Sequence, residues 1–239
     1  MGLKDFFCSA LLIYGGFLFA QDQTLQQTID RSAVEYLNAI NDVSVLYYGN
    51  VQEDHPLTTN HPYLGDVYYT KARLSYHGVV YPEAMLRLDL KRHELVVLSP
   101  DARNIVLFPE NVDEAELHGQ RVIYFRRDSL RGSPSSGYYY LLHSGNCKVL
   151  ERQNASLNRK NNNSNILEEY YIFDIRFYLL KDDVYHIIRT KRGLLQILQP
   201  CKKELKRFIS ENHLSFRKNR REEFLVKTIV EYERLTGLQ

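Results

Sequence analysis

Short runs in which apolar and polar residues alternate constrain the fold of this chain more than any other feature. In 86–91 the apolar residues Leu86, Leu88 and Leu90 alternate with a polar set, and 68–77 shows the same period of two. A period of two with one polar face is typical of antiparallel strands that cover a core on one side. The residues expected on the polar face of 86–91 are Arg87, Asp89 and Lys91.

Further strand runs follow at short spacing, so the pattern favours a meander in which neighbouring strands pair. The stretch 137–152 is a predicted hairpin around the turn Ser144-Gly145-Asn146. A second hairpin is predicted around Lys181-Asp182-Asp183. The remaining strand runs are 95–98, 105–108, 112–117, 121–125, 170–180 and 184–188.

Helical periodicity appears only near the two ends. Apolar residues recur at helical spacing in 24–40, with Thr24 as N-cap, and again in 194–198, after Pro200 and in 221–235. The fold class we expect is α+β: a mostly antiparallel β meander of about eight to ten strands, with an N-terminal helix and a C-terminal helical pair. The sheet is expected to be curved or partly barrel-like.

The N-terminus has the layout of a secretory signal peptide. Lys4 precedes an apolar stretch at 11–19, and the small residue Ala20 precedes polar Gln21. An N-terminal anchor helix is the alternative, but the apolar stretch is short for a membrane span. We therefore expect an exported protein, periplasmic or associated with the outer membrane, without a transmembrane span after cleavage.

Four segments are expected along the chain. A signal peptide occupies 1–20, and a helix plus β meander occupies 21–152. The stretch 153–165 contains six asparagines and almost no apolar residue, which is typical of a surface loop or linker. A β-hairpin and basic helices occupy 166–239 and are expected to pack on the same domain.

Charge is distributed unevenly. Residues 189–221 contain eleven Lys or Arg and two acids, although the whole chain has a net charge of only +2. Basic helices can bind nucleic acid, lipid phosphates or an acidic partner, and a solvated helix face is the ordinary alternative. Nucleic acid is disfavoured by the expected export and by the lack of a recognition motif. The candidate contact residues are Lys202, Lys203, Lys206 and Arg207.

Tyrosine is the second candidate for a contact surface. The chain has 18 Tyr and no Trp. In a strand, Tyr139 must point away from Tyr138 and Tyr140, so at least one of the three rings is expected to be exposed. An exposed tyrosine platform binds sugars or peptides, whereas the alternative is ordinary strand packing.

Residues with catalytic or metal-binding chemistry are few. His143 and Cys147 lie four residues apart, but a hairpin supplies neither the helix dipole nor the orienting third group that a thiol nucleophile needs. Glu53, Asp54, His55 and His61 could ligate a metal, but their spacing matches no known motif and prolines after both histidines favour an extended loop. We therefore assign no catalytic, cofactor-binding or metal-binding residue and expect a non-enzymatic protein. Pairing of Cys147 with Cys201 stays open.

Several stretches, in this order, resemble a family of exported, functionally uncharacterised cell-envelope proteins of Bacteroidota-type Gram-negative bacteria. They are YYGN, NHPYL with GDVYYT, YHGVVYPEAMLRLDL, the hairpin YYYLLHSGNCKVLER and the tail segments KRGLLQIL, KKELKRFISENHLSFRK and FLVKTIVEYERL. The resemblance spans nearly the whole mature chain and implies export and an envelope setting. It carries over no activity and no site residue.

Three functions are consistent with these observations. The favoured one is an envelope accessory or binding protein that acts through an envelope or outer-membrane protein partner. The second is a carrier of a small apolar ligand in a cavity of the curved sheet. The third is a hydrolase with an unfamiliar site, for which the surroundings of His55, His61 and Glu53 are the place to look.

Overall fold

The computed structural model describes residues 45–161 and 167–237. The expected signal peptide at 1–20 and the expected helix at 24–40 lie outside the described residues. Within the described ranges, none of the helices has the length and apolar character needed to cross a membrane.

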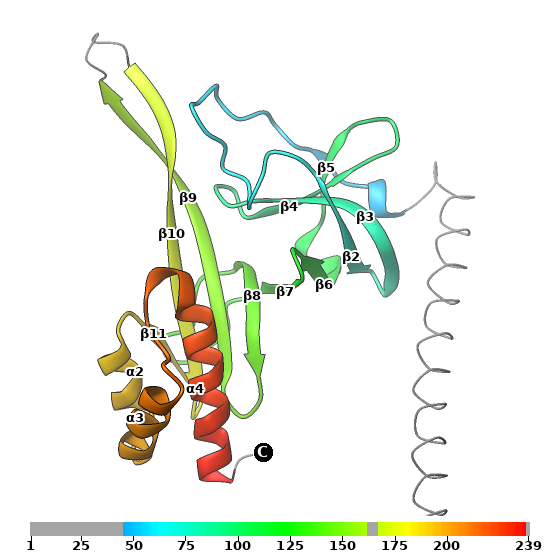
Figure 1. The fold of residues 1–239 in the computed structure, drawn as a ribbon. Coiled ribbons are helices and arrows are strands. Elements are labelled where there is room, and N and C mark those ends of the chain that lie inside the picture. The colour runs from blue at the N-terminus through cyan, green and yellow to red at the C-terminus, as the bar shows by residue number, and fades with distance from the viewer. Residues whose placement is uncertain (1–44, 162–166, 238–239) are drawn as a thin grey trace, which may run out of the picture.

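One antiparallel sheet runs through the described part of the chain (Figure 1). The strands lie in the order β1-β5-β4-β3-β2-β6-β7-β8-β9-β10-β11, and β1 does not pair with β11, so the sheet is open. The predicted meander is confirmed from β6 to β11, where every strand pairs with its neighbour in sequence. The bounds are β1 (Asn50–Val51), β2 (Thr70–Tyr76), β3 (Val79–Asp89), β4 (Glu94–Leu98), β5 (Asn104–Val106), β6 (Val112–Leu117), β7 (Gln120–Phe125), β8 (Gly137–Ser144), β9 (Lys148–Asn161), β10 (Leu167–Lys181) and β11 (Val184–Ile188).

Three α-helices follow the last strand and lie beside β8–β11, away from β1–β6 (Figure 1). They are α2 (Lys191–Ile197), α3 (Lys202–Glu211) and α4 (Arg221–Thr236), and short 3-10 turns lie at Val45–Tyr47, Pro109–Asn111 and Lys218–Arg220. Thr190 caps α2 by accepting a hydrogen bond from Gly193 N at 3.0 Å. The predicted α+β class with a C-terminal helical pair is confirmed.

Two hydrophobic clusters share one face of the sheet. The body core is built from strands β2–β8 and includes Leu74, Leu86 and Tyr138. The helix-covered core joins the sheet to α2–α4 and includes Val149 and Leu205. Along β9, alternate residues point to the same face, so Val149 of the helix-covered core and Ala155 of the body core lie on one side, with Glu151 between them.

The stretch 153–161 forms the second half of β9 rather than the predicted loop or linker. The whole of β9 pairs with β10 in an unbroken register, which runs from Asn161 opposite Leu167 to Lys148 opposite Leu180. This pairing satisfies the hydrogen-bonding capacity of the backbone N–H and C=O groups whatever the side chains are. Asparagines are therefore tolerated at exposed positions. Residues 162–166 lie outside the described residues.

The outer halves of β9 and β10 form a two-stranded arm. Pairing with β8 ends at Glu151 and pairing with β11 begins at Phe177, so the ribbon extends past both neighbours (Figure 1). The loop before β2 attaches the arm to the body. Its Asn60 side chain accepts from Tyr171 N at 2.6 Å and donates to Tyr171 O at 2.9 Å.

Candidate interaction surfaces

The basic face of α3 is the sequence-predicted site that the structure leaves accessible. Lys203, Lys206 and Arg207 are exposed and Lys202 is half-buried. On the opposite face of the helix, Leu205 and Ile209 are buried in the helix-covered core. The three lysines form no ion pair with any described residue, and Arg207 makes only a 3.9 Å contact with Glu211.

A shallow depression of about 420 Å³ adjoins these lysines. It is lined by Gln199, Pro200, Lys202, Lys203 and Lys206. The lysines therefore surround this depression at the start of α3. The buried apolar face of α3 holds the helix in place.

The prediction of an exposed tyrosine ring at 138–140 is wrong. Tyr138, Tyr139 and Tyr140 are 2%, 1% and 5% exposed, so none of them offers a contact surface. Tyr138 and Tyr140 belong to the body core, and burial raises the pKa of both hydroxyls. Tyr139 points to the other face, as expected for a strand, but that face is covered as well.

The cover over Tyr139 comes from the connection between β7 and β8. The Tyr139 hydroxyl donates to Ser135 O at 2.7 Å and accepts from Arg152 at 2.7 Å. A back-face cluster of Phe125, Tyr139, Leu150, Tyr178 and Tyr185 lies beneath this connection. The alternation of residues along one strand does not reveal whether both faces of the sheet are covered. Here both faces are covered, so all three tyrosines take part in ordinary strand packing.

His143 and Cys147 serve to attach the hairpin to α4. Glu233 of α4 accepts a hydrogen bond from Cys147 N at 2.7 Å and lies 2.8 Å from His143 Nε2. Burial, and then the nearby Glu233 carboxylate, raises the pKa of the Cys147 thiol to about 11. A thiol with so high a pKa is a poor nucleophile at neutral pH. Cys147 and Cys201 are both free thiols.

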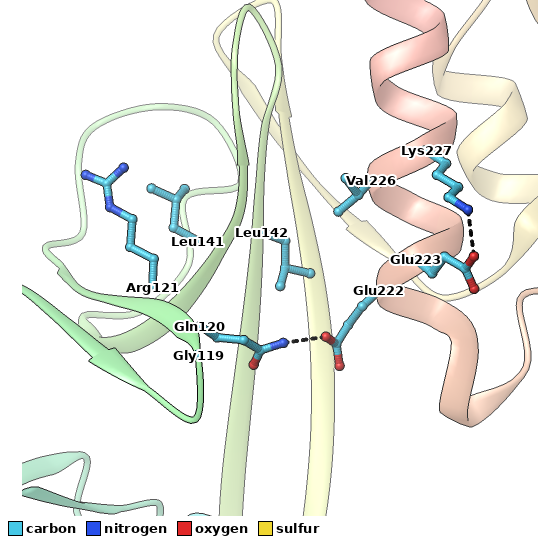
Figure 2. Close-up of a pocket in the computed structure, with 9 residues that line it drawn as sticks. All are labelled: Gly119, Gln120, Arg121, Leu141, Leu142, Glu222, Glu223, Val226 and Lys227. Carbon is cyan, nitrogen blue, oxygen red and sulfur yellow. Dashed lines mark hydrogen bonds and ion pairs between the residues drawn. The ribbon is translucent and has the colours of Figure 1, made fainter. Parts of the chain in front are cut away.

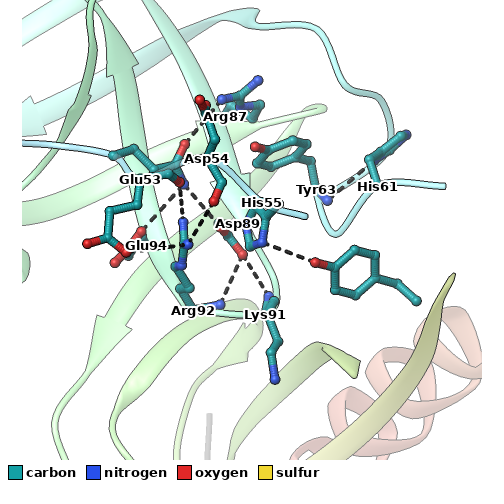
Figure 3. Close-up of polar contacts among 12 residues, drawn as sticks. Glu53, Asp54, His55, His61, Tyr63, Arg87, Asp89, Lys91, Arg92 and Glu94 are labelled. Atoms are coloured by element: carbon teal, nitrogen blue, oxygen red, sulfur yellow. Dashed lines mark hydrogen bonds and ion pairs between the residues drawn. The ribbon is translucent and has the colours of Figure 1, made fainter. Parts of the chain in front are cut away.

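His55 belongs to a hydrogen-bonded network around Asp89 (Figure 3). Asp89 is fully buried, although the strand pattern predicts it on the polar face. Its Oδ1 accepts from the backbone N–H groups of Lys91 and Arg92 at 2.8 and 2.9 Å. Its Oδ2 accepts from the Gln52 amide at 3.0 Å and lies 2.5 Å from His55 Nε2.

Both ring nitrogens of His55 are engaged. Because the carboxylate of Asp89 only accepts, Nε2–H donates to it, and Nδ1 lies 3.1 Å from the Tyr171 hydroxyl. No ring nitrogen is left for a substrate, and the Glu53 side chain is 91% exposed. No group of three or more His, Cys, Asp or Glu among the described residues is arranged to hold a metal ion. This network attaches the loop and β10 of the arm to β3.

A groove of about 410 Å³ lies between strands β7–β8 and the first half of α4 (Figure 2). Gly119, in the turn before β7, also lines it. Leu141, Leu142 and Val226 supply its apolar walls. Glu222, in the first turn of α4, accepts from the Gln120 amide at 2.7 Å across the groove. The other charged residues here are paired, Arg121 with Glu114 and Lys227 with Glu223.

Glu151 of β9 is a second buried carboxyl besides Asp89. It is 1% exposed. Its Oε1 accepts from the Gln153 amide at 2.7 Å, whereas its buried Oε2 has no hydrogen-bond partner. Burial is the main cause that raises the pKa of Glu151 to about 7, and the neighbouring Glu222 carboxyl adds to it.

Sequence reasoning did not identify Asp89 or Glu151. Asp89 occupies a polar position of an alternating strand, and Glu151 stands beside Arg152 near the end of a predicted hairpin. Neither position carries a local signal of burial, because the segments that cover Asp89 and Glu151 include residues far apart in the sequence, such as His55 for Asp89 and Leu88 for Glu151.

No protein-family model, no curated protein and no solved structure matches this chain. The site assignments therefore rest on the geometry of the chain itself.

Proposed function

We propose that this chain is an exported, non-enzymatic binding protein of the cell envelope that acts through a protein partner. The contact surface is the basic face of α3 with its depression, and the partner presents an acidic surface to it. The observation that carries the proposal is a set of lysines that form no ion pair within the described ranges, on a helix held in place by Leu205 and Ile209.

The spacing of the charges supports a docking role. Lys203, Lys206 and Arg207 recur at intervals of three and four residues, so they lie on one face of the helix. Lysines without ion pairs gain more from a partner's carboxylates than lysines whose charge is already compensated. The rest of the chain is net acidic, since the whole carries only +2. Such an asymmetric charge distribution steers association and orients the partner toward α3.

The carrier alternative receives no support from the sheet interior next to the tyrosines. The hollow lined by Tyr138, Tyr140 and Glu151 has a volume of about 10 Å³. This is room for about one water molecule, whereas ligand pockets occupy roughly 300–1,000 Å³.

A pair of matched charge reversals tests the surface. The test variant is Lys203→Glu with Lys206→Glu. The control is Arg126→Glu with Arg127→Glu, which makes the same change in net charge at two exposed residues before β8. Tagged full-length protein is crosslinked in its native envelope, and its partners are identified by mass spectrometry.

We expect the α3 variant to recover about tenfold less partner than wild type at physiological salt, and the control to recover a normal amount. Binding should also weaken as salt rises, because exposed charges are screened. Equal loss in both variants, or recovery of the protein alone, would overturn the proposal.

Export is tested separately. The mature protein should be found in the periplasmic or outer-membrane fraction, with an N-terminus at Gln21 by peptide mass mapping. A full-length protein that stays in the cytoplasm would refute the envelope part of the proposal.

A further inference from the structure

Arg152 of β9 is a buried cation that forms no ion pair with any described residue. It is 9% exposed. Its Nε donates to the side-chain oxygen of Asn154 at 2.8 Å, and its Nη1 donates to Ser135 O at 3.0 Å and to the Tyr139 hydroxyl at 2.7 Å. The further acceptors of Nη1, the Ser135 hydroxyl and Ser136 O, are also neutral. Because a buried charge is costly unless it is paired, an arginine in such a position normally has an anionic partner.

The same contacts fix the guanidinium of Arg152 and leave one of its nitrogens available. Nη2 donates to no described residue, and it is not fully buried. Gly137 lies against it: a Cβ at this position would be 3.2 Å from Nη2 and 3.5 Å from the ring of His93. The lack of a side chain at Gly137 therefore keeps Nη2 from being covered. Two N–H donors of a firmly held arginine can reach a ligand there.

Arg176 of β10 places a second guanidinium on the same face. Arg176 and Arg152 are directly opposite each other in the register of β9 and β10. Opposite residues share a face, with Cβ atoms roughly 4.5–5.5 Å apart, and like charges so placed destabilise a sheet. Asp174 lies 2.6 Å from Nε of Arg176, but these side chains are 54% and 58% exposed, so the ion pair is weak. Two arginines beside one solvated carboxylate favour the binding of a further anion.

The other groups around Arg152 add no negative charge. His93, from the turn between β3 and β4, shares the Asn154 oxygen with Arg152, at 2.9 Å from its Nε2. Burial, and then the nearby Arg152, lowers the pKa of His93, so its ring is neutral at pH 7. Glu151 is next to Arg152 in β9 and therefore points to the opposite face.

We propose that Arg152 and Arg176 form a binding site for a phosphate group. Nη2 of Arg152 donates to the phosphate oxygens, and the exposed guanidinium of Arg176 contacts them from β10. Arginine suits this role because its charge is permanent and its planar set of N–H donors matches an oxyanion. The helices cover the other face of the sheet, through Val149, so this site is separate from the basic face of α3 and does not rest on the proposed function.

Nuclear magnetic resonance of the unmodified full chain tests the site directly. The probe is inorganic phosphate, added at constant ionic strength by replacing chloride. The Nε–H signal of Arg152 should shift and saturate as phosphate is added, because the guanidinium gains an anionic acceptor at Nη2. An Nε–H signal that does not respond to phosphate would overturn the proposal.

A matched pair of variants tests the contribution of the second arginine. Arg176→Gln should weaken phosphate binding about tenfold, since it removes one charge-assisted hydrogen bond. Arg159→Gln is the control: it makes the same change of charge on the arm, at an exposed arginine paired with Glu169 on the opposite face. It should bind phosphate as wild type does. Equal affinity in all three proteins would refute a site built from Arg152 and Arg176.

Two further comparisons separate this site from the α3 surface and identify the source of the phosphate. Lys203→Glu with Lys206→Glu should leave the response of Arg152 unchanged, and loss of that response would assign phosphate binding to α3 instead. Vesicles of phosphatidylcholine with and without phosphatidic acid provide the lipid arm. Vesicle binding that needs phosphatidic acid and Arg176 assigns a lipid headgroup, whereas a response to inorganic phosphate alone assigns a soluble phosphorylated ligand.

Discussion

Two buried carboxyl groups of this molecule lie in opposite environments. Asp89 is surrounded by donors: two backbone N–H groups, the Gln52 amide and His55. Glu151 is buried almost as completely but receives a single amide hydrogen bond, and its Oε2 has no hydrogen-bond partner. A buried carboxylate whose lone pairs are saturated by donors is a fixed part of the structure, whereas one without enough donors becomes a site for a proton.

The positions of the two groups match this difference. The Asp89 junction joins β3 to the loop and arm, through His55 and Tyr171. Glu151 instead lies inside the sheet, beside Leu88, Leu90 and Val122, with one oxygen unpaired. The Asp89 junction therefore fixes an arrangement of strands, whereas Glu151 is a buried carboxyl without enough donors.

The largest effect is expected from Asp89→Ala. It removes the acceptor of four hydrogen-bond donors, of which the Gln52 amide keeps a 3.4 Å contact with Glu94, and should lower the free energy of unfolding by about 3–5 kcal/mol at pH 7. Urea denaturation followed by circular dichroism measures the loss. Asp101→Ala, which removes an exposed aspartate that contacts Ser99 and Arg103, is the control and should cost far less. Equal losses would contradict the distinction drawn between the two carboxyl environments.

Glu151→Gln should act in the opposite direction. Wild type has a raised Glu151 pKa, so it loses stability as pH rises from 4.5 through about 7, and glutamine does not. At pH 8 the variant should be more stable than wild type by on the order of 3 kcal/mol, and at pH 4.5 the two should be similar. Denaturation curves at both pH values provide the measurement. A variant that is destabilised at pH 8 would show that Glu151 is a saturated carboxylate like Asp89.

The smallest effect is expected from Tyr171→Phe, which removes only the hydroxyl that lies 3.1 Å from His55 Nδ1. Loss of one such hydrogen bond should cost about 1 kcal/mol and speed amide exchange in the arm. Tyr170→Phe is the matched control, since its hydroxyl contacts only Asn158 within the arm. If both variants exchange alike, the Asp89 network does not hold the arm.

The sequence predicts the elements well where one side of a strand or helix is buried. The alternating runs become β2–β8, and the apolar stripes of the C-terminal region become α2–α4. The prediction fails where another segment pairs with a strand or covers its second face. Asn-rich 153–161 is a strand because β10 pairs with it, and Tyr139 is buried because the connection between β7 and β8 folds over it.

The candidate sites divide in the same way. The basic face of α3 is predictable because charge and helical period both lie in one short segment. His55 and Glu53 suggest chemistry by residue type, yet the fold turns His55 into a structural contact and leaves Glu53 in solvent. Glu151 resembles an ordinary surface residue in the sequence, and only the packing around β9 reveals that it is buried.

The Asn60 contact has a consequence for how the arm behaves toward other chains. Its amide pairs with both backbone groups of Tyr171, as one residue of an adjoining strand would. An incoming strand must displace that amide before it can extend along β10. Asn60 therefore divides the outward edge into short stretches, one of them beside the exposed Ile172 and Phe173. The Thr59 N–H, which donates to Glu169 O at 3.0 Å, occupies a further position of the same edge, so this loop hinders sheet-to-sheet aggregation.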